Sequence, residues 1–324
     1  MRRFAFFILT FFLLIGLVGG GVLVWGFAQY IKPGPTISEN TVFIPEGSSV
    51  DSIAKILESE DVIDDAMIFR LGVRLSRVDK ELQAGEFAFS HGISAKGAAE
   101  VLINGKTVIR RLTIAEGLTA FQVFDQLVAT NGLEETFDVP LEGSILPETY
   151  YFSYGDKRTD LVKRMIRAMD NNLNRLWQER AIDLPFKGAD EALILASIVE
   201  KETGVKAERA RIAGVFINRL NKGMRLQSDP TVVYGLNKGD GPLGRQLLRA
   251  DLKKKTPYNT YTINGLPPGP ICNPGLAAIR AVLNPQKTNE LYFVADGKGG
   301  HVFSTNLKEH NRNAARWRKI RDAN

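Results

Sequence analysis

The sequence predicts an α+β protein with an N-terminal transmembrane helix, a small α+β module and a larger mixed α/β domain with a helical core. Three observations predict this fold class. Residues 4–28 carry no charge, residues 41–110 alternate strand-like and helix-like patterns, and beyond residue 160 apolar residues recur at helical spacing. The predicted divisions are 1–35 for cytoplasmic N-terminus, anchor and stalk, 36–110 for the module, and 111–324 for the large domain.

The apolar run at residues 4–28 is long enough to cross a bilayer, since about 20 helical residues span a hydrocarbon core of roughly 30 Å. A cleaved signal peptide needs only about 7–15 apolar residues and a small-residue cleavage site, which Phe27-Ala28-Gln29 does not supply well. Arg2 and Arg3 precede the run. The positive-inside rule therefore predicts a single-pass inner-membrane protein with a cytoplasmic N-terminus and a periplasmic remainder.

Composition narrows the range of partners. The formal net charge is +6, but the basic residues are dispersed, and an exported domain would not meet nucleic acid. An anionic envelope polymer or lipid surface is the more economical partner. The single cysteine, Cys272, excludes an intrachain disulfide and any cysteine-rich metal site.

A short pattern occurs twice, at residues 44–49 and 114–119. Each copy is a β-like run, a Glu-Gly turn and a Ser or Thr suited to capping a helix. Between the copies, residues 85–89 alternate as a strand and Ser94 is placed to cap a helix through about Asn104. In size and pattern, residues 36–110 resemble the LysM-like sugar-binding folds, although a spacer that positions the next domain fits the same pattern equally well.

The large domain is predicted to hold helices at 161–176, 190–202 and 206–221. Residues 224–274 are rich in Gly, Pro, Asn and Asp, and a long irregular segment of this kind is typical of a functional surface. A helix over 274–283 and a hairpin around residues 296–300 close the domain. The glycines of this hairpin lack phosphate-loop spacing.

Few kinds of catalysis remain open to this sequence. His91, His301 and His310 are the only histidines, and their spacing suits no zinc site, so neither a metal nor another cofactor is expected. No Gly-x-Ser-x-Gly elbow occurs. What remains is a carboxylate at the end of the apolar helix over 190–202, where burial would raise the pKa of a glutamate toward neutrality. Spacing alone does not choose between Glu200 and Glu202.

Several motifs resemble the YceG-like family of endolytic murein transglycosylases. They read EGSILPETY (142–150), ASIVEKET (196–203), VFINRL (215–220), MRLQSDPTV (224–232), YNTY (258–261) and GLPPGPICNPG (265–275). The resemblance implies cleavage of the MurNAc-β-1,4-GlcNAc bond of nascent peptidoglycan, leaving 1,6-anhydroMurNAc ends, with Glu200 as the catalytic glutamate. One glutamate suffices in such a lyase because the C6 hydroxyl of the substrate attacks the anomeric carbon.

Substrate contacts are predicted in the loops of the large domain. Their amide, carboxylate, hydroxyl or aromatic groups suit sugar hydroxyls, acetamides and pyranose faces. The predicted residues are Gln227, Asp229, Asn259, Tyr261 and Asn273, together with Glu148 and Tyr150. Each also fits a purely structural role in a turn or in the core.

Two other functions fit the same residues. A hydrolytic muramidase would pair Glu200 with a second carboxylate, Glu148 or Asp229. A non-catalytic envelope scaffold would bind glycan through the LysM-like module and recruit peptidoglycan synthases. The glycan product separates the three, because hydrolysis leaves a reducing end, transglycosylation leaves an anhydro end, and a scaffold leaves the strand intact.

Overall fold

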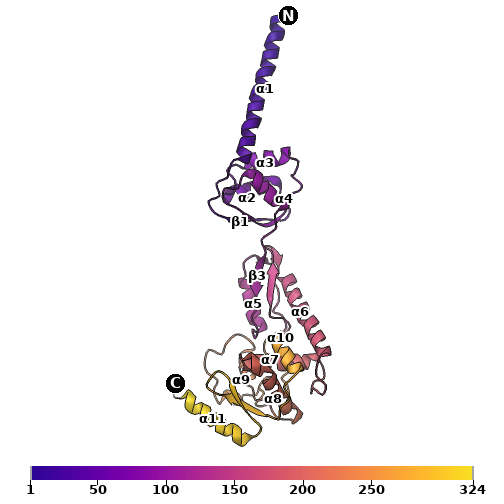
Figure 1. The fold of residues 1–324 in the computed structure, drawn as a ribbon, viewed down its shortest axis with the longest axis vertical. Helices are drawn as coiled ribbons and strands as arrows, with labels where there is room; N and C mark the ends of the chain where they lie inside the picture. The colour runs from indigo at the N-terminus through magenta and orange to yellow at the C-terminus, as the bar shows by residue number, and fades with distance from the viewer. Residues whose placement is uncertain (1, 323–324) are drawn as a thin grey trace. The chain divides into compact units, whose positions relative to one another are not determined.

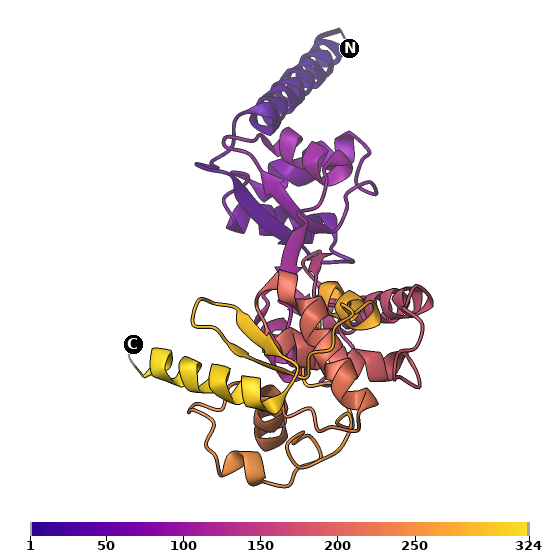
Figure 2. The same ribbon diagram turned by 60° about the horizontal axis from the view of Figure 1, so that its bottom comes forward.

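The computed structural model describes residues 2–322, which form two compact units (Figures 1 and 2). The first unit comprises Met1–Arg110 and Tyr151–Gly155, and the second Arg111–Tyr150 and Asp156–Asn324. Both contain helices and strands, which confirms the predicted α+β class.

Helix α1 (Arg2–Ile31) begins the first unit, drawn in indigo in Figure 1. Its segment Leu9–Ile31 has 23 residues with a mean hydropathy of 2.2. Most of its large apolar side chains are exposed, as in a helix that a bilayer rather than a protein core surrounds. By length and composition this helix is compatible with a single-pass membrane anchor.

The rest of the first unit packs three helices against a two-stranded antiparallel sheet. Its elements are β1 (Asn40–Ile44), α2 (Val50–Ser59), α3 (Ala66–Leu75), β2 (Gly85–Phe89) and α4 (Ala95–Asn104). The two strands pair from Asn40 with Phe89 to Ile44 with Gly85. The Ser94 hydroxyl accepts a hydrogen bond from the Gly97 N–H, which confirms the predicted cap of α4. Helix α3, which Asp65 caps, was not predicted from the sequence.

The second unit opens with short strands around one helix. They are β3 (Arg110–Thr113), paired with β5 (Thr149–Phe152), and β4 (Leu133–Glu134), paired in parallel with β6 (Asp156–Lys157). Between β3 and β4, helix α5 (Ala120–Ala129) starts at a capping box formed by Thr119 and Gln122. The repeated pattern of the sequence therefore precedes a capped helix in both copies, at Ser49 and at Thr119.

Four helices build the core of the second unit: α6 (Arg158–Gln178), α7 (Ala189–Glu202), α8 (Arg209–Asn221) and α10 (Leu276–Leu283). Helix α7 contacts the other three, because Leu195, Ile198 and Val199 are fully buried among their apolar side chains. All four helices lie where the sequence predicts them. A short 3₁₀ helix, Lys206–Glu208, precedes α8.

The segment predicted to be irregular holds one further helix, α9 (Asp229–Asn237), and a 3₁₀ turn at Asp251–Lys253. Helix α9 was not predicted because it is short and starts at Asp229-Pro230, a sequence that also begins turns. The predicted hairpin is confirmed by β7 (Tyr292–Ala295) and β8 (His301–Ser304). Helix α11 (Leu307–Arg321) ends the chain and has no buried residue among those described.

We expect Gly214→Ala to destabilise the second unit. A Cβ at Gly214, on α8, would lie 2.4 Å from the backbone oxygen of Gln286, so the backbone must shift. Overpacking of this kind costs about 1–3 kcal/mol and outweighs the roughly 0.5–1 kcal/mol that Ala normally gains over Gly inside a helix. Thermal unfolding measures the effect. Gly204→Ala is the control, because a Cβ there meets no atom within 4 Å; equal melting temperatures for the two variants would contradict the packing.

Candidate active site at the end of helix α7

The last turn of α7 carries Glu200 and Glu202, which point into different surroundings. Positions two apart on a helix face nearly opposite directions. The buried residues Ile198 and Val199 anchor this turn in the core, so both directions are fixed. Any difference in the chemistry of the two carboxyl groups therefore comes from their neighbours.

Glu200 is enclosed by partners from within the protein. Its Oε1 accepts a hydrogen bond of 2.9 Å from Arg209, and its Oε2 accepts one of 3.0 Å from the Gly275 N–H. Only 5% of its side chain is exposed. Both oxygens of Glu200 are thus engaged by donors that hold the end of α7 to the start of α8 and to the loop before α10.

Arg209 joins Glu200 to a second carboxylate, Glu116. The Arg209 guanidinium lies 3.3 Å from a carboxylate oxygen of Glu116 and is itself buried. Glu116 belongs to the Glu-Gly turn before α5, and its side chain fills the space that a Cβ on Gly275 would need. Four segments distant in sequence meet at this ion-paired cluster of Glu116, Glu200, Arg209 and Gly275.

Glu202 lies in a different environment. Like Glu200, it is a residue of intermediate exposure, and its Oε1 accepts a hydrogen bond from the Ser228 hydroxyl. The protein packed around it raises the pKa of this carboxyl to about 7, and the nearby Asp229 carboxylate adds to the rise; Ser228, His301 and Arg219 act in the opposite direction. Glu202 is therefore a carboxyl group that holds or releases a proton near neutral pH.

The loop before α9 carries two predicted substrate residues and contacts both Glu202 and a third predicted residue. Gln227 is exposed and has a φ of 54°, a left-handed conformation that is uncommon for residues other than glycine. The following Ser228 reaches Glu202, and Asp229 accepts a hydrogen bond of 2.6 Å from the Tyr261 hydroxyl. Gln227 and Asp229 thus flank Ser228, the hydrogen-bond partner of Glu202, and Tyr261 contacts the same loop through Asp229.

The other four predicted contacts lie in different settings. The side-chain amide of Asn259 donates to backbone oxygens of residues 252 and 254, and the amide of Asn273 bonds the backbones of residues 118 and 145. The Tyr150 hydroxyl donates to the Leu146 oxygen, and its ring is buried. Glu148 is exposed directly before β5. The first three side chains hold loops together, and their contact with sugar stays a prediction.

A cavity of about 540 Å³ opens beside this loop, between α7, α9 and the turn before α5. Lys201, which separates the two glutamates, lines it together with Thr119, Asp229, Tyr234 and Arg245. Tyr234 and Arg209 were not predicted from the sequence, because neither residue lies in a motif whose residue types and spacing indicate catalysis. Ser228 lies within the motif MRLQSDPTV, next to the predicted contact Asp229, and this position is the sequence signal that could have identified it.

Within residues 2–322, no group of three or more His, Cys, Asp or Glu side chains is arranged to hold a metal ion. Cys272 is fully buried, and its thiol donates to the Ser197 oxygen, an arrangement that suits packing rather than nucleophilic attack.

The YceG-like family model matches residues 42–316. The chain belongs to the YceG-like family. It is 34% identical to an endolytic murein transglycosylase of Bacillus subtilis (strain 168), over 91% of this chain and 90% of that protein. It is 32% identical to a protein of the same name from Streptococcus pneumoniae serotype 2 (strain D39 / NCTC 7466), over 85% of this chain and 58% of the streptococcal one.

A solved structure supports the same relationship. The crystal structure of a YceG-like protein from Listeria monocytogenes aligns with a TM-score of 0.56 at 33% identity, covering 85% of this chain and 98% of that one. The motifs at the ends of α7 and before α9 therefore belong to a YceG-like chain, as their resemblance suggested.

Replacing Arg209 with Gln is expected to lower the free energy of unfolding of this YceG-like protein by about 3–5 kcal/mol, because Glu200 would stay buried without its cationic partner. Intrinsic-fluorescence unfolding in detergent measures the loss. The matched control is Arg175→Gln, which breaks an exposed pair with Glu179 on α6 and should cost about 0.5 kcal/mol or less. Similar losses in the two variants would show that the cluster at Arg209 contributes no more than a surface pair.

Proposed function

We propose that the protein is an endolytic lytic transglycosylase, a lyase that cleaves peptidoglycan strands at the MurNAc-β-1,4-GlcNAc bond without consuming water and leaves 1,6-anhydroMurNAc ends. Membership of the YceG-like family and the names of its relatives support the reaction class. The observation that carries the mechanism is the setting of the Glu202 carboxyl: it accepts a hydrogen bond from Ser228, which lies between exposed Gln227 and Asp229, and burial raises its pKa to about 7. The proposed role in the cell is to end the elongation of nascent strands.

In this mechanism, Glu202 acts first as acid and then as base. Its proton goes to the glycosidic oxygen, so the bond from that oxygen to C1 of the MurNAc residue breaks and the GlcNAc hydroxyl leaves. The C6 hydroxyl of the same MurNAc residue then bonds to C1, and its proton passes to the Glu202 carboxylate. The proton count balances, and the enzyme returns to its starting state without a second catalytic carboxylate.

The neighbours of Glu202 support these two steps. The Ser228 hydroxyl stabilises the carboxylate that forms after proton donation, while the surrounding protein and the Asp229 charge favour recovery of the proton. Asp229 also lies where a negative charge can stabilise a positively charged sugar ring. Exposed Gln227 and the Tyr261 ring are the proposed sugar contacts of this loop.

The family resemblance predicts Glu200 as the catalytic residue, whereas we propose Glu202 because its pKa is raised and it contacts the loop before α9. Both oxygens of Glu200 are held by Arg209 and the Gly275 N–H, so Glu200 would have to give up these partners before it could contact substrate. We therefore propose a positioning role for Glu200. The assignment of catalysis to Glu200 stays a prediction, and the variants Glu200→Gln and Glu202→Gln test it.

Anchoring is the second part of the proposal. Helix α1 would cross the inner membrane once, with Arg2 and Arg3 in the cytoplasm and the two compact units on the periplasmic side. The proposed LysM-like module, residues 36–110, would hold the glycan strand, and residues 111–324 would form the catalytic domain. Peptidoglycan synthases are proposed partners, because the enzyme that ends a strand must act where strands are made.

Glu202→Gln is expected to lower the release of anhydro-ended muropeptides by at least about 10²–10⁴-fold, the usual contribution of a general acid or base. Mass spectrometry of the digestion products measures it. Glu200→Gln is the matched variant on the same helix turn: it should lower the melting temperature yet leave anhydro products detectable at low temperature. An active Glu202→Gln enzyme beside an inactive, folded Glu200→Gln enzyme would assign catalysis to Glu200. Reducing ends would indicate a muramidase, and intact strands a scaffold.

The rate should fall as the pH rises through about 7, where Glu202 loses the proton that it donates. The raised pKa also has a stability consequence. The folded state binds this proton more tightly than the unfolded chain, so the stabilisation is fully present below the ordinary glutamate pKa and is lost as the pH rises through about 7. Profiles of kcat/KM and of melting temperature against pH measure both effects. Glu202→Gln should flatten the stability profile, and a rate that keeps rising beyond pH 7 would contradict the role of this carboxyl as acid.

A further inference from the structure

Helix α3 exposes an apolar ridge that no described part of its unit covers. Met67, Leu71 and Leu75 follow one another at four-residue spacing, so they share one face of the helix. They are 57%, 50% and 72% exposed, whereas Phe69 and Val73, on the opposite face, are fully buried. Three large exposed side chains in one row need a partner that is itself apolar.

The ridge is continuous with the apolar surface of α1. Gly72 of α3 lies directly against the Tyr30 ring of α1, since a Cβ on Gly72 would come within 2.3 Å of a ring carbon. A cavity of about 270 Å³ lies between the two helices. Val22 and Phe27 line it from α1, and Met67, Leu71 and Leu75 line it from α3. The ridge therefore lies beside the last turns of the proposed membrane span.

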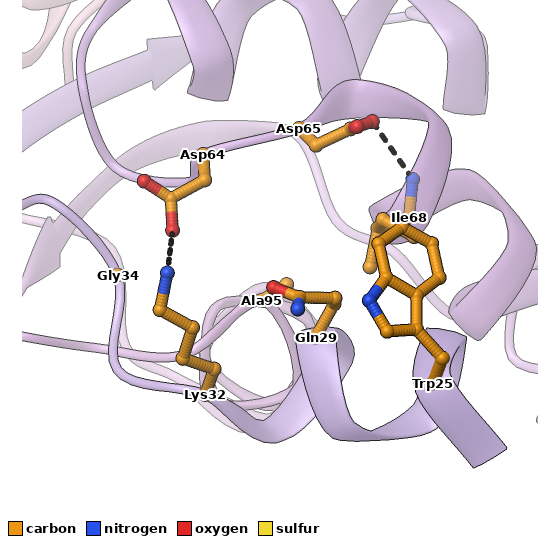
Figure 3. A pocket seen from close by; sticks show the side chains of 8 residues that line it. All are labelled: Trp25, Gln29, Lys32, Gly34, Asp64, Asp65, Ile68 and Ala95. Carbon is orange, nitrogen blue, oxygen red and sulfur yellow. Dashed lines mark hydrogen bonds and ion pairs between the residues drawn. The ribbon is translucent and has the colours of Figure 1, made fainter.

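Polar groups mark where this apolar surface ends. Figure 3 shows Gln29 between Trp25, which lies next to Ile68, and Lys32, whose ammonium lies 3.5 Å from the Asp64 carboxylate. A tryptophan followed by charged groups is typical of the boundary between hydrocarbon and headgroups. This polar pocket and the apolar cavity are both lined by Trp25 and Ile68, so α3 lies at the depth of that boundary.

The charges of α3 also suit a lipid surface. Arg70 and Arg74 both pair with Asp51 on α2, at 2.8 Å and 3.6 Å, but Arg74 remains largely exposed, and Arg77 is exposed just beyond the helix. A helix with apolar residues on one face and arginines beside them is typical of segments that lie in the membrane interface, with their apolar face about 5–10 Å deep. Anionic headgroups would meet Arg74 and Arg77.

We propose that α3 is a membrane-docking helix: Met67, Leu71 and Leu75 insert into the outer leaflet beside α1, and the first unit is held against the bilayer through two contacts rather than one. This inference rests on the proposed anchoring by α1. The occupant of the ridge is lipid, because the ridge continues a surface that the bilayer already covers.

The test uses the full chain in bilayer nanodiscs that contain anionic lipid. Single cysteines at Leu71, Leu17 and Lys55 carry an environment-sensitive fluorophore, and lipids with nitroxide-labelled acyl chains act as quenchers. The native Cys272 is fully buried, and labelling of the unaltered chain checks that it does not react. Leu17 lies within the span, and Lys55 lies on the exposed face of α2 in the same unit.

We expect the label at Leu71 to be quenched by the lipid nitroxides to an extent comparable with Leu17, and the label at Lys55 to keep its fluorescence. Quenching at Leu17 with a Leu71 signal like that of Lys55 would overturn docking while leaving the anchor in place. A lack of quenching at Leu17 would overturn the anchor, and with it the inference. Anhydro-product formation is measured on the same samples. A failure of the proposed enzymatic function is therefore distinguished from a failure of membrane docking.

A second set of variants separates lipid from a protein partner. Met67→Ser combined with Leu75→Ser should reduce the lipid quenching of a label at Leu71, because two of the three inserted side chains are lost. Ile182→Ser, at an apolar residue of the second unit that is more exposed than Met67 or Leu75, should leave the quenching unchanged. A Leu71 label that is protected from aqueous iodide but not quenched by lipid would mean that protein covers the ridge, and would overturn the proposal.

Discussion

The ion-paired cluster around Arg209 is the constraint on which the rest of the candidate site depends. It ties the end of α7 to the start of α8, to the Glu-Gly turn before α5 and to the loop before α10. A buried charge that loses its partner is costly, so these four segments keep one relative position as long as the cluster is intact. Glu202 lies two residues beyond Glu200 on the same helix turn, so the cluster fixes its position as well.

Glu200 and Glu202 are identical side chains with different surroundings. Glu200 meets a cation and a backbone donor and is held in the structure. Glu202 meets a hydroxyl, a neighbouring carboxylate and dense protein, and its pKa rises to about 7. Neighbouring carboxyl groups in such different surroundings are able to take different roles. In our proposal, one helix turn supplies both a positioning residue and a proton carrier.

The repeated strand-turn-helix pattern shows a similar division. Ser49 and Thr119 cap the helices that follow the two copies in the same way. Only the second copy contributes its turn to the site, since Glu116 faces Arg209 and the Lys201 ammonium donates to the Gly117 oxygen. The first copy lies in the unit that carries α1 and the apolar ridge of α3. The same local structure therefore contributes to the candidate site in one unit only, because long-range contacts differ between the two copies.

The sequence by itself determined those features that depend on neighbours along the chain. The uncharged run produced α1, apolar residues at helical spacing produced α6, α7 and α8, and the capping residues Ser94 and Thr119 fixed where helices begin. These signals are local, so hydropathy and hydrogen-bonding rules are enough to read them. The family motifs also identified which end of which helix carries the candidate site.

Only the tertiary structure distinguished the surroundings of Glu200 from those of Glu202. Spacing along α7 left Glu200 and Glu202 equivalent, because their partners Arg209, Gly275 and Ser228 come from segments 9 to 75 residues away. The same holds for Asn259, Asn273 and Tyr150: their polar groups suit a sugar by type, and only the folded chain shows them bonded to backbone. Residue type determines what a side chain is able to do, whereas long-range packing determines its protonation, its exposure and its partners.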